Sequence, residues 1–165
     1  MKIYVTGLGV VSGIGIGVSE NIEALRQRKH GIGKVTLFPT ALDVPVSEVK
    51  RSNEELKQLI SLPPQRTVSR TALLGMIAAK EAMKDAGLTP PLRIGFISAT
   101  SVGGMDLSEH FYESFKKNPG QGRLREVISH DCGASTELIA SYLGINDFTV
   151  SYTHLRAHET EADLV

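Results

Sequence analysis

The chain contains one cysteine, Cys132, in the run His130-Asp131-Cys132-Gly133. A cysteine nucleophile needs a base within hydrogen-bond reach, and a third group often orients that base. Residues that are adjacent in sequence rarely adopt this geometry, and a free cysteine commonly serves as a small buried apolar side chain. We therefore expect a packing role for Cys132. A single cysteine also rules out an internal disulfide and a multi-cysteine metal site in this chain.

Two histidines near the end of the chain, His154 and His158, are four residues apart and precede Glu159. On a helix this spacing would place both imidazoles on one face, where they could hold a zinc ion. The pattern is not the H-E-x-x-H of zinc peptidases, and chain ends tend to fray. The sequence therefore favours a solvated tail over a metal site, and we expect neither a metal nor a cofactor.

The stretch from Gly7 to Gly17 is rich in glycine, which would allow a backbone to approach the phosphates of a nucleotide. A dinucleotide site needs G-x-G-x-x-G between a strand and a helix. Here Gly9 and Gly13 are separated by one residue too many, and the chain has no G-x-x-x-x-G-K-[ST] phosphate loop. We interpret the stretch as a turn where segments pack closely, with a nucleotide-binding module as an alternative.

The hydrophobic pattern predicts the elements that position these residues. Strands are predicted at Lys2–Thr6, Arg93–Thr100 and Asn146–Ser151 in one sheet, the second of them buried. The clearest helix, Ser69–Ala86, has a broad apolar stripe and a glycine, Gly87, to end it. Alternation of strands and helices indicates an α/β fold with a mostly parallel sheet.

Shorter helices are predicted from the capping and stop signals. They run from Ser19 to about Arg28, near Asn53–Ile60, from an Asp106/Glu109 capping box through Phe115, and from Ser135 or Thr136 to Gly144.

The composition is that of a globular protein with one core: 165 residues, 41% hydrophobic and 22% charged. Eighteen Lys and Arg balance eighteen Asp and Glu, so no net field attracts nucleic acid or an anionic membrane. No apolar run is long enough to span a bilayer. We therefore expect a soluble, cytoplasmic protein with no nucleic-acid and no membrane partner.

Several segments, taken in order, resemble one family, the β-ketoacyl-acyl-carrier-protein synthases of the condensing-enzyme, thiolase-like group. They are Tyr4-Val-Thr-Gly-Leu-Gly-Val-Val-Ser12, Ser69-Arg-Thr-Ala72 with Ala82-Met-Lys-Asp-Ala-Gly-Leu88, Ile94-Gly-Phe-Ile-Ser98 with Ser101-Val-Gly-Gly104, and His130-Asp-Cys-Gly-Ala-Ser-Thr136 with Ile139-Ala-Ser-Tyr-Leu-Gly144. The match keeps its register over about residues 2–151. It implies a partial thiolase-like α/β/α sandwich, the N-terminal half of the family fold, with residues 1–151 as an incomplete synthase domain.

The sequence departs from the family pattern at two places. Gly13 stands where members commonly have proline. More importantly, members continue after Val-Ser with Thr-Ala-Cys-Ser, which carries the nucleophile, whereas Ser151 here precedes Tyr152-Thr-His154. The family's two histidines and lysine lie further downstream, so no catalytic residue can be carried over. Residues 152–165 resemble translated sequencing-adapter DNA, and we expect a non-family, disordered or artefactual tail.

The resemblance implies decarboxylative condensation of acyl and malonyl thioesters carried by acyl carrier protein, in a homodimer. Alignment to the family places Met105, Leu107, Ser108 and Cys132 near the acyl chain and the dimer partner. A fragment should also expose apolar surface where the second half of the fold would pack. Two alternatives stay open, namely a non-catalytic partner subunit like a chain-length factor and the nucleotide-binding module.

Overall fold

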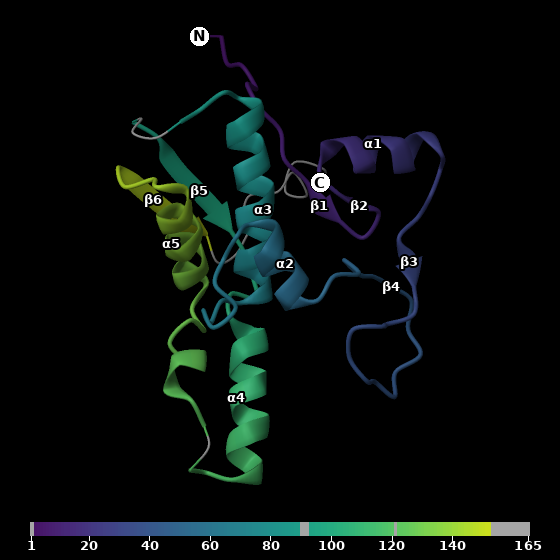
Figure 1. Cartoon of the computed structure of the whole chain (residues 1–165), viewed down its shortest axis with the longest axis vertical. Coiled ribbons are helices and arrows are strands. Elements are labelled where there is room, and N and C mark those ends of the chain that lie inside the picture. Colours follow the sequence, from purple (N-terminus) through teal and green to yellow (C-terminus); the bar gives the residue numbers. More distant parts are fainter. Residues whose placement is uncertain (1, 90–92, 121, 153–165) are drawn as a thin grey trace, which may run out of the picture. The chain divides into compact units, whose positions relative to one another are not determined.

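The structure is a computed structural model that describes residues 2–89, 93–120 and 122–152 of the chain. Its helices are α1 (Val18–Arg26), α2 (Asn53–Leu59), α3 (Arg70–Asp85), α4 (Met105–Lys117), α5 (Cys132–Leu143) and the 3-10 helix η1 (Leu124–Glu126) (Figure 1). Its strands are β1 (Val11–Ser12), β2 (Gly15–Ile16), β3 (Ile32–Gly33), β4 (Val46–Ser47), β5 (Gly95–Ala99) and β6 (Phe148–Tyr152). The histidines His154 and His158, like the rest of residues 153–165 of the predicted tail, lie outside the described residues.

The chain divides into two units. The first comprises the described residues of 1–64 and 74–89, and the second those of 65–73 and 90–165. Helix α3 contributes its first turn to the second unit and the rest of its length to the first. Together the units form a mixed α/β fold.

The predicted long helix is confirmed as α3. Four residues of its apolar stripe are buried, namely Ala72, Leu73, Met76 and Ile77. Gly87 ends the helix with a φ of 66°, and the Leu88 N–H donates to the Met83 carbonyl at 2.9 Å. This left-handed glycine stop is the one that the sequence predicts, because a residue with a Cβ atom adopts that backbone conformation only at a cost.

The predicted strand at Lys2–Thr6 is wrong. A strand needs a neighbouring backbone to pair with, and among the described residues none pairs with this segment. Ile3, Tyr4 and Val5 are 83%, 73% and 79% exposed. Instead of continuing a strand, the chain after Thr6 lies along α3, and the N–H of Leu8 donates to the Asp85 carboxylate at 3.0 Å.

A short hairpin, β1–β2, follows this segment and leads into α1. The side chain of Asn21 holds the hairpin, because its amide donates to the Gly15 and Gly17 carbonyls at 2.9 and 2.8 Å. Asn21 and Ala24 are therefore the buried residues of α1, whereas Ile22 and Leu25 are exposed. This helix begins at Val18 after Gly17 and ends at Arg26, close to the predicted bounds.

Helix α2 confirms the prediction near Asn53–Ile60. The hydroxyl of Ser52 accepts from the Glu55 N–H at 3.2 Å, and the Glu55 carboxylate accepts from the Ser52 N–H at 2.7 Å. This reciprocal capping box satisfies two backbone donors that a helix start otherwise leaves unpaired. The helix buries Leu56 completely, and Ile60, the residue after it, is 3% exposed.

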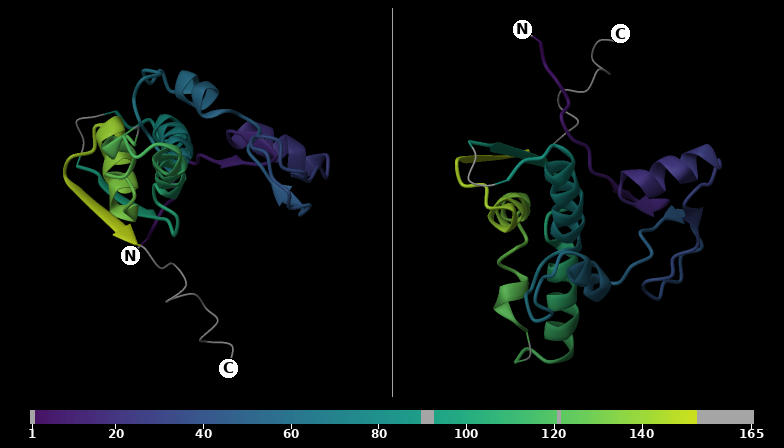
Figure 2. Two further views of the ribbon diagram at one scale, coloured as in Figure 1. Left: turned by 90° about the horizontal axis from the view of Figure 1, so that it is seen from below. Right: turned by 45° about the horizontal axis from the view of Figure 1, so that its top comes forward.

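The second unit contains a parallel pair, β5–β6, with α5 alongside it (Figure 2). Both strands were predicted, but among the described residues the sheet has two strands and not the three expected, since Lys2–Thr6 does not join it. The expected burial of Arg93–Thr100 is also wrong on one face, because Ile97 is 63% exposed. Phe148 of the neighbouring strand β6 is 54% exposed. Helix α5 covers only one face, and a parallel sheet is normally covered on both.

The starts of α4 and α5 differ from the predictions. Helix α4 begins at Met105 after Gly104, so Asp106 lies inside its first turn and does not cap it. Helix α5 begins at Cys132 after Asp131, three residues before the predicted cap. Ser135 and Thr136 are each 1% exposed within the helix. Gly144 ends α5 with a φ of 72°, as predicted.

Across the described ranges, no helix combines the length and apolar character needed to cross a membrane.

Candidate functional site

Two glycines bring the start of α4 against the segment that precedes α5. A Cβ atom on Gly104 would lie 1.8 Å from the Ser129 carbonyl oxygen, so only glycine fits there. The N–H of Gly104 donates to the His130 carbonyl at 3.2 Å. Gly103 has a φ of 52°, and a Cβ on it would lie 2.7 Å from the same carbonyl. We call residues 103–108 with 129–132 the α4–α5 corner.

A side-chain hydrogen bond crosses the α4–α5 corner. The hydroxyl of Ser108 lies 2.9 Å from Nδ1 of His130. A hydroxyl can donate to or accept from an imidazole nitrogen, so either tautomer of His130 is compatible with this contact. The bond fixes the first turn of α4 to the loop that leads into Cys132.

The corner contains all four residues that the family resemblance places near the acyl chain. Leu107, Ser108 and Cys132 are half-buried, whereas Met105 is 43% exposed at the first position of α4. Through His130, the structure joins Ser108 to the segment that carries Cys132. Cys132 itself is the first residue of α5 and has a free thiol. Met105 is therefore more exposed to solvent than Leu107, Ser108 and Cys132.

Sequence reasoning missed the contacts that two polar residues of this corner make. The Asp106 carboxylate accepts the N–H of Arg70, the first residue of α3, at 2.8 Å. It thereby satisfies one of the backbone donors at that helix start, while its other oxygen is buried without a hydrogen-bond partner among the described residues. His130 was noticed only as a neighbour of Cys132. No local signal reveals either contact, because the partners are 36 and 22 residues apart.

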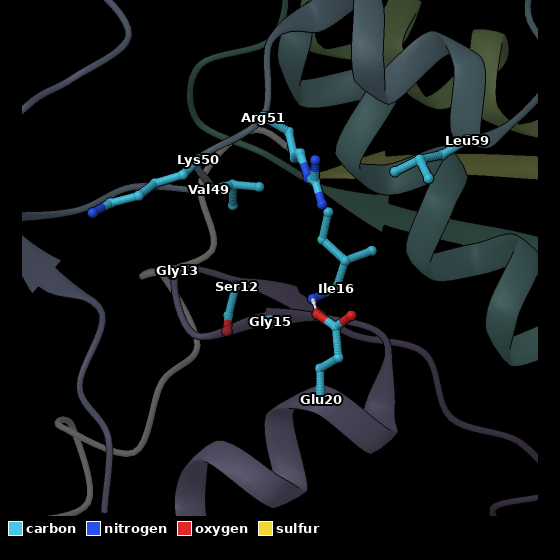
Figure 3. A pocket seen from close by; sticks show the side chains of 9 residues that line it. All are labelled: Ser12, Gly13, Gly15, Ile16, Glu20, Val49, Lys50, Arg51 and Leu59. Carbon is cyan, nitrogen blue, oxygen red and sulfur yellow. Dashed lines mark hydrogen bonds between the residues drawn. The ribbon is translucent and has the colours of Figure 1, made fainter.

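The glycine-rich stretch lines a cavity of about 450 Å³ in the first unit (Figure 3). The lining residues are Ser12, Gly13, Gly15, Ile16, Glu20, Val49, Lys50, Arg51 and Leu59. In the close-up, Arg51 extends toward Ile16, and Glu20 reaches up to the backbone of that residue. The Ile16 N–H donates to Glu20 at 2.8 Å, and the Ile14 N–H donates to Ser12 Oγ at 3.2 Å.

The glycines around this cavity have a packing role. A Cβ on Gly13 would lie 2.1 Å from Ser47 Oγ, and one on Gly15 would lie 2.6 Å from the Cβ of Glu20. The hairpin N–H groups of Ile14 and Ile16 are bound to side chains of the protein itself. A phosphate loop instead points successive backbone N–H groups at its ligand. The geometry therefore favours the close-packed turn over a nucleotide-binding loop.

In the part of the chain that the structure describes, no three His, Cys, Asp or Glu side chains gather in a way that could hold a metal ion.

Comparison with known proteins gives one family. The profile of the family described as "Beta-ketoacyl synthase, N-terminal domain" matches residues 1–146. Nodulation protein E of Rhizobium meliloti is 30% identical over 153 residues, which cover 87% of this chain and 37% of that protein. The 3-oxoacyl-[acyl-carrier-protein] synthase 2 of Coxiella burnetii is 30% identical over 122 residues, 68% of this chain and 28% of that protein.

Solved structures agree with the sequence comparisons. The ishigamide ketosynthase/chain length factor aligns with a TM-score of 0.76 and 26% identity, over 89% of this chain and 39% of that one. A ketosynthase bound to a hexaketide, in complex with its type II polyketide acyl-carrier protein, has the same fold at a TM-score of 0.66 and 22% identity, over 90% of this chain and 37% of that one. The chain thus spans 28% to 39% of the length of these four proteins.

Proposed function

The chain belongs to the β-ketoacyl synthase family, and we propose that it is the N-terminal part of a 3-oxoacyl-[acyl-carrier-protein] synthase. The observation that carries this proposal is the family match over residues 1–146, together with a fold that aligns at a TM-score of 0.76 to a ketosynthase. The intact protein would condense an acyl thioester with a malonyl thioester with loss of carbon dioxide. Fatty-acid or related polyene synthesis is the pathway that we propose for it.

The chemistry of such a synthase needs two kinds of group. A cysteine thiolate accepts the acyl group, and donors polarise the malonyl thioester carbonyl while carbon dioxide leaves. The resulting carbanion then attacks the acyl thioester. By family resemblance, the thiolate belongs shortly after Val150-Ser151, two residues that lie in β6 here. The polarising histidines belong further downstream.

At the family's positions the chain as given has neither kind of group, and we propose that it has no synthase activity. Its one cysteine, Cys132, is the first residue of α5 and so precedes β6 in the sequence, whereas the nucleophile is expected after Ser151. After Ser151 the sequence reads Tyr152-Thr-His154 in place of Thr-Ala-Cys. Residues 1–151 would then be an incomplete synthase domain, and residues 152–165 a tail foreign to the family.

We further propose that the α4–α5 corner borders the acyl chain in the complete protein. Leu107, Ser108 and Cys132 are half-buried there, and the Ser108–His130 hydrogen bond holds the two helix starts together. Ser108 and Cys132 are small, so they would leave room for a long or bulky acyl chain. The acyl carrier protein and a second copy of the intact chain are the partners of this proposal.

Reading the genomic DNA through codon 151 tests the proposal directly. We expect the intact gene to continue with Thr-Ala-Cys-Ser and a C-terminal half. Grafting that half onto residues 1–151 should restore both carbon dioxide release and condensed product. A gene that continues as residues 152–165 do and then stops would contradict the fragment interpretation.

A non-catalytic partner subunit is the second candidate. Two observations favour it: one structural relative is a ketosynthase/chain length factor, and no cysteine follows Val150-Ser151. The genomic sequence separates the candidates, because a partner subunit would retain the full family length with another residue at the nucleophile position. Such a protein should produce condensed product only when mixed with an active synthase.

A nucleotide-binding module remains a third, weaker alternative. The cavity beside β1–β2 carries Lys50 and Arg51, but Arg51 pairs with Glu55 at 3.0 Å, and the glycines serve packing. A thermal-shift series with nucleotides tests it. We expect no change in the melting temperature, and a clear stabilisation would revive this reading.

A further inference from the structure

The first residues of the chain form a segment with no strand partner. Lys2–Thr6 has the residue types of a strand, and all of its residues are exposed. Ile3, Tyr4 and Val5 are large side chains that keep most of their surface in solvent. Among the described residues, no hydrogen bond satisfies the backbone N–H and C=O groups of this segment. Its backbone is therefore available for pairing with another strand.

Strand β5 has an unpaired edge. Its five residues, Gly95–Ala99, pair on one side with β6, and within the described ranges no other strand joins this sheet. The outer N–H and C=O groups of an edge strand can template pairing with another chain. Natural edge strands are commonly protected by charged residues, proline or a bulge. β5 has no charged residue and no proline, and its register with β6 is continuous, so this edge is open to pairing.

The face of the sheet beside this edge is apolar and open. Ile97, the middle residue of β5, is 63% exposed, and Phe148 of β6 is also exposed. The ring of Phe148 lies over Gly95, where a Cβ atom would collide with it. A parallel sheet is normally covered on both faces. A further strand beside β5 would bring apolar side chains next to Ile97.

We propose that Lys2–Thr6 of one copy of this chain pairs with the open edge of β5 in a second copy. The two segments match in length, with five residues each. Pairing joins two rows of unsatisfied backbone groups. Successive side chains of a strand point to opposite faces, so either Tyr4 or the pair Ile3 and Val5 lies beside Ile97.

A second copy is the partner because each chain carries both halves of the contact and leaves both unpaired. Two copies can therefore supply what each lacks, and exchange of an identical element is a low-cost route to a dimer. The pairing is assigned to β5, because its central Ile97 is more exposed than any other large apolar residue described in the sheet. The proposal does not rest on the synthase function.

The test links cysteines that are placed on separate chains. In the Cys132→Ala background, which removes the native thiol, Tyr4→Cys and Val5→Cys are each mixed with Ile97→Cys. A thiol reagent that spans about 5 Å, one strand spacing, is then added. A linked peptide that joins both sites, identified by mass spectrometry, must come from two chains. We expect one of Tyr4→Cys and Val5→Cys to link several-fold more than the other, because they lie on opposite faces of a strand.

Val150→Cys is the matched control for Ile97→Cys. Val150 is the register partner of Ile97 in β6, so it lies one strand further from the proposed edge, and we expect weaker linking to it. Stronger linking to Val150→Cys would overturn the proposal, as would equal linking of Tyr4→Cys and Val5→Cys, or none. A chain that carries both cysteines of the linked pair should link only between copies. Linking within the monomer at high dilution would also overturn the proposal.

Proline substitutions test the backbone pairing itself. Only alternate N–H groups of a strand face one neighbour, so either Tyr4→Pro or Val5→Pro removes a hydrogen bond to β5. We expect that variant to raise the dissociation constant of the dimer about tenfold, the order of one lost backbone hydrogen bond. Sedimentation velocity at a series of concentrations measures it. Val44→Pro, at an exposed position outside the segment, is the control. A monomeric parent chain, or a dimer equally stable in the parent and both variants, would overturn the proposal.

Discussion

A Cβ atom on Gly9 would lie 1.9 Å from the carbonyl oxygen of Ala78, so the glycine-rich segment lies directly against the backbone of α3. Gly7 has the same relationship to the next turn, with a distance of 2.3 Å to the Ala82 carbonyl oxygen. Glu81 secures the approach, because its two carboxylate oxygens accept the N–H groups of Val10 and Val18 at 3.0 and 2.8 Å. These contacts place β1–β2 and the start of α1 on one side of α3.

The first prediction follows from this approach. Gly9→Ala should lower the free energy of unfolding by about 1–3 kcal/mol, the usual cost of overpacking, because the obstructing atoms belong to helix backbone. Urea denaturation followed by circular dichroism measures it. Gly33→Ala is the control, since a Cβ there meets no atom within 4 Å. Equal stability of the Gly9→Ala variant and the parent chain would contradict the packing account.

The second prediction concerns Glu48, whose pKa is held below its ordinary value, chiefly by the Thr36 hydroxyl that donates to it at 2.6 Å. The N–H groups of Leu37 and Thr36 contribute in the same direction. Thr36→Val should therefore raise the pKa of Glu48 toward the ordinary value of a glutamate, as seen by NMR titration of its side-chain carbonyl carbon. Thr89→Val, at an exposed position, should leave this pKa unchanged.

The same shift has a consequence for stability. A carboxyl with a lowered pKa in the folded state stabilises the fold above the pKa of the unfolded chain. That contribution is lost as pH falls through the lowered value. Parent and Thr36→Val chains should therefore differ in melting temperature at neutral pH and converge in acid. A difference that grows in acid would contradict the assigned hydrogen bond.

The third prediction is that the isolated chain associates. Ile97 and Phe148 on the open face of β5–β6 are 63% and 54% exposed, and exposed apolar patches favour association. Size-exclusion chromatography should show species larger than 17.8 kDa, and Ile97→Ser should reduce them. Ile128→Ser, at an exposed position outside the sheet, is the control. A strictly monomeric chain that unfolds cooperatively would count against this prediction.

The fourth prediction concerns chain length. In a chimera that carries the family's C-terminal half after Ser151, Cys132→Phe should shorten the preferred acyl chain, because a ring would fill space at the α4–α5 corner. Ser108→Leu should act in the same direction, with the added loss of the His130 hydrogen bond. Product analysis by mass spectrometry measures both. An unchanged product profile in both variants would contradict the proposal that the α4–α5 corner borders the acyl chain.

The fifth prediction is that the chain as given is inactive. Incubation with acyl- and malonyl-carrier protein should yield neither carbon dioxide nor condensed product, because the chain lacks the family's nucleophile and electrophilic groups. The Cys132→Ala variant is the matched control. Turnover by the parent chain that disappears in this variant would show that Cys132 is the nucleophile, and the family alignment would then be wrong.

Local sequence signals predicted the parts of the fold that depend on nearby residues. Helix α3 follows from its apolar stripe, and both of the glycine stops, Gly87 and Gly144, follow from the left-handed backbone that a helix end needs. The family assignment came from ordered segments that together covered most of the chain, and the profile match over residues 1–146 confirms it.

Only the tertiary structure decided the contacts between distant residues. Asp106 was expected to cap its own helix but accepts the Arg70 N–H, and the contact of Ser108 with His130 was not predicted. Lys2–Thr6 has the residue types of a strand, but those types cannot supply a neighbouring backbone to pair with. The sequence by itself therefore determined the helices and the family, because their signals lie within a few residues of each other. The pairing of strands and the hydrogen bonds between distant side chains depend on which segments pack together. They were therefore decided only by the tertiary structure.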